Sequence, residues 1–244
     1  MKLQQLLSLT RKAVDEYQMI EAGDCIAVGI SGGKDSLTLL HALHGLMRFY
    51  PKPFTIHAVT VNLGFPEADY TPVRRLCEEL QVPYTVVDTE IAQIIFQQRK
   101  ESNPCSLCAK MRKGALNEAV KKIGCGKVAY AHHRDDLVET MLLSLIYEGR
   151  FHCFSPKTYL DRTDLWVIRP LMFVSEADVI GFRNQHQLPV VQNPCPADGY
   201  TRRQYVKELL ADLNRAEPGV KERMFSTTLN GQIAGWPPRT PRVR

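Results

Sequence analysis

The segment Cys25-Ile-Ala-Val-Gly-Ile-Ser-Gly-Gly-Lys-Asp-Ser36 decides the fold. Its first half is a short apolar run that predicts a buried strand, and the residues after it, 37–49, have the apolar spacing of a helix. The glycines between strand and helix let the backbone approach an anion closely, and the helix offers its positive N-terminus to phosphate. We therefore expect nucleotide phosphates to bind at residues 31–36.

This loop is not a Walker A loop. Three residues separate Gly29 from the Gly33-Lys34 pair, where Walker A has four, and Asp35 stands where Walker A has Ser or Thr. Lys34 supplies a point charge, the serines at 31 and 36 supply hydroxyl donors, and Asp35 suits a magnesium ion beside the phosphates. The alternative is an ordinary glycine turn followed by a helix N-cap.

Strands alternate with helices along most of the chain. Further strands are expected at 55–61, 84–88, 127–131 and 165–169. This order predicts an α/β fold with a doubly wound parallel sheet of five strands, in which ligands bind beyond the carboxyl ends of the strands. The chain divides into an N-terminal helix (1–24), a nucleotide-binding α/β domain (25–175), a helical C-terminal extension (176–234) and a flexible tail (235–244).

Composition places the chain among soluble globular proteins. Its 244 residues suggest one or two domains, and 44% hydrophobic and 23% charged residues are ordinary values. No apolar run is long enough to span a membrane, and the charged N-terminus lacks the pattern of a signal peptide, so we expect a cytoplasmic protein. The net charge of +5 is concentrated at residues 202–244, which contain nine Lys and Arg but four Asp and Glu. This favours a polyanionic partner, with a solvated helix face and tail as the alternative.

A second motif, Ala131-His-His-Arg-Asp-Asp-Leu-Val-Glu-Thr140, follows the expected fourth strand. It therefore lies at the same edge of the sheet as the loop at 31–36. Because Asp135 and Asp136 are adjacent, they cannot both face one point. One is expected to orient the loop or cap the next helix, and the other to hold magnesium or act on the substrate. His133 is a candidate for phosphate contact or proton transfer, and a plain helix cap is the alternative.

Three of the seven cysteines have the setting of metal ligands. An odd number in a chain without a secretory pattern argues against disulfides, and we expect Cys25 and Cys77 to be buried packing residues. Cys105 and Cys108 form a C-x-x-C followed by basic residues, and Cys195 stands between two prolines. Two cysteines alone fit a redox pair, a zinc half-site or a cluster half-site, whereas three thiolates fit a [4Fe-4S] cluster with one iron lacking protein sulfur.

The loop at 29–36 resembles the signature of the PP-loop ATP pyrophosphatase superfamily, whose members cleave ATP between the α and β phosphates and adenylate a carbonyl oxygen. The run at 131–140 resembles an element of PP-loop enzymes that modify tRNA. Together with 105–108, the Ile-Arg-Pro-Leu run at 168–171 and Cys195, these motifs follow the order found in tRNA 2-thiocytidine synthetases. The sequence is similar to that family over roughly residues 20–230.

The resemblance implies a reaction and assigns roles to particular residues. ATP would activate the C2 oxygen of an anticodon-loop cytidine, and sulfur carried by a [4Fe-4S] cluster, supplied by a cysteine desulfurase or another sulfide donor, would replace it. The implied cofactors are ATP, Mg²⁺ and the cluster, the implied partner is tRNA, and a homodimer is a possible assembly. The nucleotide site would comprise Ser31, Gly32, Gly33, Lys34, Asp35, Ser36 and His133; the catalytic residues would be Lys34, Asp35, Asp135 and Asp136; the cluster ligands would be Cys105, Cys108 and Cys195. Many family members have a further cysteine where this chain has Asp198.

Three rival functions remain at this point. Thiolation of a uridine would use the same chemistry, but its enzymes usually carry terminal zinc-binding cysteine pairs, and residues 1–24 and 226–244 contain no cysteine. Ligation of an amine to a base does not call for three cysteines. A non-catalytic, nucleotide-sensing metal protein does not call for the aspartate pair.

Three basic residues after the third cysteine are candidates for contact with the tRNA backbone. We expect Arg202, Arg203 and Lys207 to provide this contact. The alternative is a set of solvated ion pairs with Glu208 and Asp212.

Overall fold

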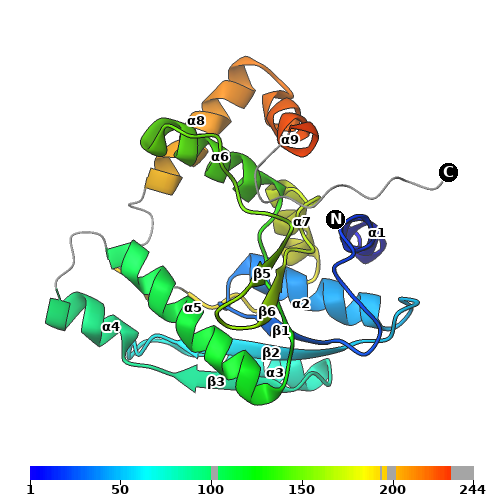
Figure 1. Ribbon diagram of the computed structural model, residues 1–244, viewed down its shortest axis with the longest axis vertical. Coiled ribbons are helices and arrows are strands. Elements are labelled where there is room, and N and C mark those ends of the chain that lie inside the picture. Colours follow the sequence, from blue (N-terminus) through cyan, green and yellow to red (C-terminus); the bar gives the residue numbers. More distant parts are fainter. Residues whose placement is uncertain (100–103, 193, 197–201, 232–244) are drawn as a thin grey trace.

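One mixed β-sheet organises the molecule. The computed structural model describes residues 1–99, 104–192, 194–196 and 202–231. In these residues the strands are β1 (Cys25–Gly29), β2 (Thr55–Asn62), β3 (Tyr84–Asp88), β4 (Lys127–Ala129), β5 (Lys157–Leu160) and β6 (Leu165–Ile168). They lie in the order β3-β2-β1-β4-β6-β5 (Figure 1).

The described sheet has six strands rather than the five predicted. The five expected strands are parallel to one another, and β5 pairs antiparallel with β6 at the edge. The two strands form a hairpin in which Asp164 takes a positive φ of 50°. A four-residue edge strand beside a short turn leaves little periodic pattern in a sequence. The predicted α/β class is confirmed.

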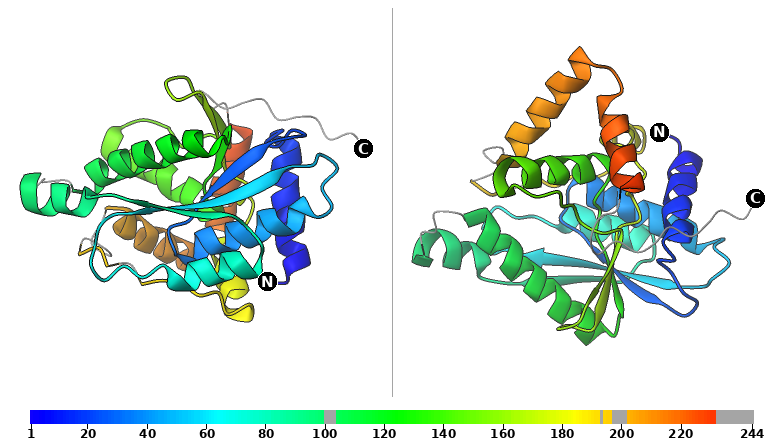
Figure 2. Two further views of the ribbon diagram at one scale, coloured as in Figure 1. Left: turned by 90° about the horizontal axis from the view of Figure 1, so that it is seen from below. Right: turned by 45° about the horizontal axis from the view of Figure 1, so that its top comes forward.

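Helices cover both faces of the sheet (Figure 2). They are α1 (Leu3–Glu16), α2 (Lys34–Met47), α3 (Thr71–Glu79), α4 (Ile91–Gln93), the π-helix η1 (Ile94–Arg99), α5 (Pro104–Ile123), α6 (Arg134–Glu148), α7 (Glu176–Gln185), α8 (Arg202–Ala216) and α9 (Val220–Asn230). Helix α5 lies on one face, and α2 and α3 lie on the other. No helix in the described ranges combines the length and the apolar character needed to cross a membrane.

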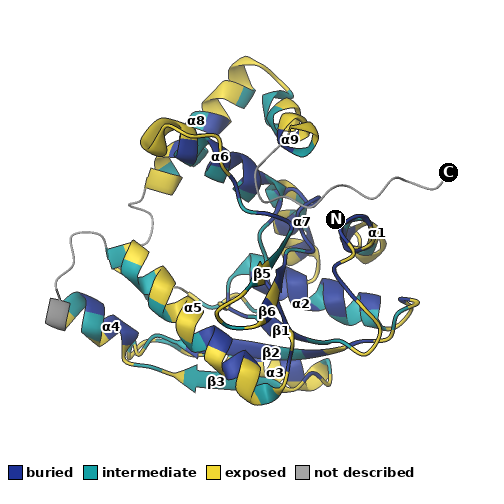
Figure 3. Cartoon of the chain, in the orientation of Figure 1, coloured by how far each residue is buried: buried dark blue, intermediate teal, exposed yellow. Residues whose placement is uncertain are grey.

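The core has two parts because side chains of a strand alternate between the faces of a sheet. Ile26 and Val28 of β1 belong to the larger cluster, together with residues of α1, α2 and α7. Ala27 points to the other side, into a smaller cluster with Leu116 and Val120 of α5. Figure 3 shows this burial along β1 and α2, whereas α8 has a broad exposed surface.

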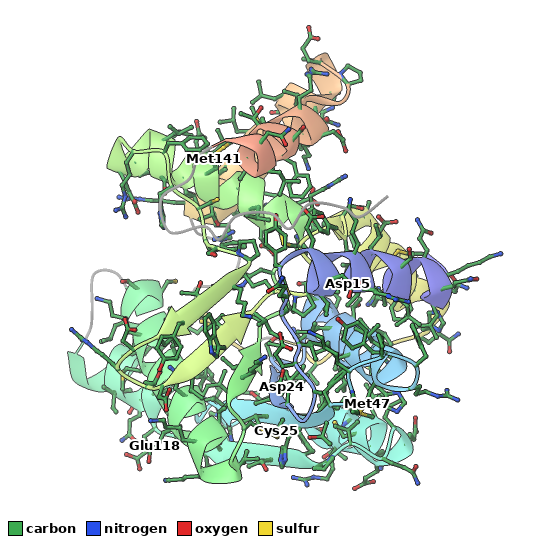
Figure 4. All side chains as sticks on the ribbon, turned by 45° about the vertical axis from the view of Figure 1, so that its right-hand side comes forward. Asp15, Asp24, Cys25, Met47, Glu118 and Met141 are labelled. Carbon is green, nitrogen blue, oxygen red and sulfur yellow. A yellow bond between two sulfur atoms is a disulfide. The ribbon has the colours of Figure 1, made fainter. Side chains whose placement is uncertain are left out.

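Helices α6, α8 and α9 pack together above the sheet edge (Figure 1). Met141, labelled in this upper group of helices in Figure 4, accepts a hydrogen bond at 3.3 Å from the Thr228 hydroxyl of α9. Helix α6 lies within residues 25–175, the expected nucleotide-binding domain, but it packs with the C-terminal helices α8 and α9. The division at residues 24, 175 and 234 stays a prediction, and the tail at 235–244 lies outside the described residues.

The expectation that no cysteines pair is wrong for Cys25 and Cys125, which form a disulfide (Figure 4). Cys25 begins β1, and Cys125 stands two residues before β4. These strands are neighbours in the sheet, with Ile26 opposite Lys127. The sheet thus brings together two thiols that are 100 residues apart in the sequence. Cys77 is buried as expected.

Candidate active site

The nucleotide loop, residues 30–33, connects β1 to α2. The Ser36 hydroxyl, in the first turn of α2, holds the loop in shape. The Ser36 hydroxyl accepts a hydrogen bond from the Ser31 N–H at 3.2 Å and donates one to the Gly33 carbonyl at 2.9 Å. Gly33 is the N-cap of α2, so the loop already wraps the helix N-terminus. This is the arrangement that binds phosphate through backbone amides and the helix dipole.

Gly32 joins the nucleotide loop to the segment that carries the third cysteine. Its φ of +83° favours glycine, and a Cβ there would make a tight contact of 3.0 Å with the Val191 Cβ. The Val191 N–H donates a hydrogen bond to the Gly32 carbonyl at 3.0 Å. Because four residues span at most about 14 Å, Cys195 lies within that distance of Val191. Cys195, one of the three predicted metal ligands, therefore lies on the segment that contacts the nucleotide loop.

Lys34 is held between two carboxylates. Its Nζ lies 3.0 Å from Asp35 Oδ1 and 3.3 Å from Glu176 Oε1. Burial disfavours the charged form of Lys34, but the two carboxylates outweigh it, and the pKa is raised. Phosphate oxygens can replace the carboxylates around this ammonium group. Glu176 was not predicted from the sequence, because its only local signal is its place after Ser175, the N-cap of α7.

His133 and Asp136 form the cap of α6. The His133 Nδ1 accepts a hydrogen bond from the Asp136 N–H at 3.3 Å, and Asp136 Oδ2 accepts one from the His133 N–H at 2.9 Å. The expected capping carboxylate is thus Asp136. Because Nδ1 is an acceptor, the neutral ring carries its hydrogen on Nε2, which faces Asp35 Oδ1 at 3.7 Å.

Asp135 ties three helices together. Its Oδ2 accepts a hydrogen bond from the Glu176 N–H at 2.8 Å, and its Oδ1 lies 3.4 Å from the Lys221 Nζ of α9. Both oxygens of Asp135 therefore have partners within the protein. Asp35 contacts only side chains among the described residues, and these can move aside. Of the three aspartates assigned from the sequence, Asp35 has the oxygens best placed to reach a magnesium ion.

Two basic residues of α8 bind the helices beneath it. Arg203 Nη1 lies 3.1 Å from Glu139 Oε2, and Lys207 Nζ lies 2.5 Å from Glu176 Oε1. The alternative of pairs with Glu208 and Asp212 is therefore wrong for both residues. These ion pairs fix α8 on α6 and α7. They also neutralise part of the positive charge that could attract a polyanion. Arg202 differs, because its guanidinium lies over the Tyr147 ring at 4.7 Å and has no described carboxylate partner.

A half-buried positive charge lies beyond the carboxyl ends of β4 and β6. Arg169 Nε donates a hydrogen bond to His132 Nδ1 at 3.3 Å, and its Nη1 donates one to the Ser155 carbonyl. Burial, with the charge of Arg169, lowers the pKa of His132 to about 3. Burial lowers the pKa of Arg169 only to about 10, so the guanidinium stays charged at neutral pH. The pair of Arg169 with His132 was not predicted, although the Ile-Arg-Pro-Leu run at 168–171 is one of the sequence motifs.

Two of the three predicted ligand cysteines begin α5. Cys105 is exposed, Cys108 is half-buried, and Cys195 is half-buried on the segment next to the nucleotide loop. Burial raises the pKa of the Cys108 thiol, Arg112 opposes the shift, and Cys195 and Cys105 add to it. Cys105 and Cys195 therefore both act on the Cys108 thiol. Of the basic residues that follow the C-x-x-C, Arg112 lowers the pKa of Cys108, and burial outweighs this effect.

Within the described ranges, no three His, Cys, Asp or Glu side chains are close enough to share one metal ion. The ligands of a four-iron cluster bind different irons, so they do not have to meet at one point. Asp198 lies outside the described residues.

The fold and the loop define the class of protein. A family model described as the PP-loop domain matches residues 4–213. A U34-tRNA thiolase, NcsA from Methanococcus maripaludis, has a similar fold, with a TM-score of 0.73 at 22% identity over 92% of this chain and 78% of that one. An NH3-dependent NAD synthetase from Campylobacter jejuni aligns with a TM-score of 0.50 at 15% identity, covering 100% of this chain and 99% of that one. The protein is a PP-loop α/β protein.

Sequence relatives narrow the class to one family. The tRNA-cytidine(32) 2-sulfurtransferase of Geobacter sulfurreducens is 37% identical over 91% of this chain and 87% of its own length. The enzyme of the same name from Neisseria meningitidis is 37% identical over 89% of this chain and 69% of its own length. The chain belongs to the tRNA-cytidine(32) 2-sulfurtransferase family of PP-loop enzymes.

Glu176 gives a testable link between α8 and the nucleotide loop. Lys34 and Lys207 both pair with the carboxylate of Glu176. The change Lys207→Met removes one of these partners, so the ion pair between Glu176 and the Lys34 ammonium group becomes stronger. ATP binding should weaken roughly fivefold, since coupling within such a network is about 1 kcal/mol. In a Glu176→Gln background the same change should have no effect on the ATP Kd, measured by calorimetry. Arg215→Met, which removes an exposed pair within α8, is the matched control. An equal loss in both backgrounds would contradict the link.

Proposed function

We propose that the protein replaces the C2 oxygen of cytidine 32 in tRNA with sulfur, using ATP, Mg²⁺ and a [4Fe-4S] cluster in the cytoplasm. The single observation that carries this proposal is the contact between Val191 and Gly32, because it joins the nucleotide loop to the segment bearing Cys195. The family relationship supports the reaction and the base. The three cysteines support the cluster.

The first half of the reaction activates the base. The C2 oxygen attacks the α-phosphorus of ATP, a new O–P bond forms, and pyrophosphate leaves from the α–β bond. The loop amides and the N-terminus of α2 bind the phosphates, and Lys34 neutralises the charge that develops on their oxygens. Asp35 would hold the magnesium ion. His133 presents its Nε2–H on the same side, where it can donate to a phosphate oxygen.

The second half of the reaction exchanges oxygen for sulfur. Sulfide adds to C2 of the base, the C2–O bond breaks, and AMP leaves with the original oxygen. Cys105, Cys108 and Cys195 would hold the cluster, and the cluster would supply the sulfide as the nucleophile. Arg169 keeps a fixed positive charge near the ends of β4 and β6, which favours the anionic species of this step. A cysteine desulfurase is the proposed sulfide donor, and a homodimer remains compatible with the proposal.

Mass spectrometry of tRNA nucleosides tests this function. Cells lacking the protein should lose 2-thiocytidine, and the wild-type gene should restore it whereas the Lys34→Ala variant should not. In vitro, AMP and pyrophosphate should form in a tRNA-dependent manner. Loss of a thiolated uridine with 2-thiocytidine intact would contradict the choice of base. Release of ADP and phosphate would contradict the chemistry.

Arg202 is the residue of α8 expected to contact the tRNA backbone, because its charge has no described carboxylate partner. Arg202→Ala should weaken tRNA binding and reduce the slope of log Kd against log salt by about 0.7 to 0.9, the value for one phosphate contact. Filter binding over a salt series measures the slope. Arg215→Ala on the same helix should leave it unchanged, since that side chain pairs with Asp212. An unchanged slope for Arg202→Ala would place the tRNA contact on another surface.

A further inference from the structure

A surface hollow lies next to the third cysteine. It has a volume of about 390 Å³, and its walls include Gly64, Phe65, Gln93, Phe96, Gln97 and Pro196. These residues come from three separate segments, namely the loop after β2, the helices α4 and η1, and the residue that follows Cys195. The volume is in the range of ligand-binding clefts, about 300–1,000 Å³.

The walls combine aromatic rings with amide groups. The Phe65 and Phe96 ring centroids are 6.0 Å apart, with an angle of 49° between the planes, and both side chains are half-buried. Gln93 and Gln97 are exposed and stand four residues apart, on one side of their helical segment. Each amide can donate and accept hydrogen bonds. Such walls suit a flat heterocycle with polar edges better than an aliphatic side chain.

The backbone around the hollow is fixed and unusual. Gly64 has a φ of +87°, and a Cβ there would lie 2.6 Å from the Thr89 carbonyl oxygen, so no other residue fits. Its N–H donates a hydrogen bond to the Asn62 side chain at 3.1 Å. On the other side, η1 is a π-helix of six residues. Such segments are rare and frequently occur at functional sites.

The hollow adjoins the segment that carries the third ligand cysteine, because Pro196 in its wall directly follows Cys195. Phe96, also in its wall, and Cys108 of α5 pack against the same apolar core cluster. A group bound in this hollow therefore lies next to the segment of Cys195. The residues of the nucleotide loop do not line it.

We propose that this hollow binds the unpaired pyrimidine base that undergoes thiolation, stacked on Phe65 and Phe96. The inference rests on the proposed function, because it takes RNA as the substrate. RNA-binding sites recognise unstacked loop bases by stacking them on aromatic rings and by pairing their polar edges with side-chain amides. The occupant must be close to the source of sulfur, and the position of Pro196 meets this requirement.

Two RNA probes test the pocket with the full-length protein. One is an anticodon stem-loop with cytidine at position 32, and the other has an abasic site there. Wild-type protein should bind the cytidine probe more tightly. Phe65→Leu and Phe96→Leu keep an apolar side chain but remove the ring, and each should weaken binding of the cytidine probe roughly tenfold while leaving the abasic probe unchanged. Phe65→Tyr should retain the preference. Phe49→Leu, at an exposed phenylalanine beside α2, is the matched control.

The readouts separate this inference from the proposed function. If wild-type protein forms 2-thiocytidine and Phe65→Leu binds both probes as wild type does, the pocket assignment fails alone. A parallel loss for both probes, or a weaker ATP Kd in the leucine variants, would also overturn it, since the ring would then serve the fold or the adenine of ATP. Absence of thiolation and of RNA binding in wild-type protein would overturn the proposed function itself.

Discussion

Lys34→Ala is expected to slow tRNA-dependent formation of AMP and pyrophosphate by about 10² to 10³-fold, the usual cost of removing one group that stabilises charge in a transition state. The ammonium group lies at the N-terminus of α2, and burial does not discharge it, because Asp35 and Glu176 raise its pKa. Without it, the leaving pyrophosphate keeps the loop amides but loses a full positive charge. Rapid-quench measurement of labelled AMP gives the rate.

Two comparisons make the Lys34 result specific. Lys52→Ala removes an exposed lysine that pairs with Glu21 away from the loop, and it should leave the rate unchanged. The iron content of Lys34→Ala should equal that of wild type, because no cysteine contacts this residue in the described structure. A rate within threefold of wild type, on the scale of about 0.7 kcal/mol, would show that the loop does not use Lys34 on phosphate.

Local patterns made the nucleotide loop predictable. A strand, a glycine loop and a helix N-terminus are adjacent in sequence, so the segment from Cys25 to Ser36 contains most of the information that determines its shape. The cap formed by His133 and Asp136 is equally local, since the two residues are three positions apart. In both motifs the residues that contact each other are at most five positions apart in the sequence.

The contacts that complete the site are distant in sequence and left no pattern. Lys34 meets Glu176, and Asp135 meets Lys221, only because the sheet order places α7 and α9 over the loops after β1 and β4. The same cause explains the disulfide between Cys25 and Cys125, which both stand at the amino ends of the neighbouring parallel strands β1 and β4. Periodicity and spacing describe one element at a time and cannot show which side chains of two elements meet.

These distant contacts change the interpretation of the basic C-terminal segment. Its net charge suggested a surface for tRNA, yet Arg203, Lys207 and Lys221 each pair with a carboxylate of α6 or α7. Their main physical effect is to hold α8 and α9 on the nucleotide site. Charge counted along a sequence therefore overstates the charge available to a partner.

Substitution of a predicted cluster ligand is expected to have the second large effect, on iron content and thiolation. Cys195→Ala is expected to remove most of the protein-bound iron and to abolish thiolation, because a cluster held by three thiolates loses one of its anchors and exposes a second iron. ATP-dependent formation of AMP should persist, since the loop amides and Lys34 are untouched. Iron and labile sulfide assays on anaerobically purified protein measure the loss, and visible absorbance reports the cluster.

Cys108→Ala should reproduce the loss of iron, and Cys77→Ala should not. Cys77 is a suitable control because it lies on the buried face of α3. Burial raises the pKa of its thiol to about 11, so the thiol stays protonated and is a poor metal ligand. Both alanine variants remove one thiol from the same chain, so a difference between them reflects position rather than thiol count. Full iron retention in Cys195→Ala would separate the third cysteine from the metal. The contact between Val191 and Gly32 would then serve the nucleotide loop alone, and the chemistry proposed for the second half of the reaction would need another source of sulfur.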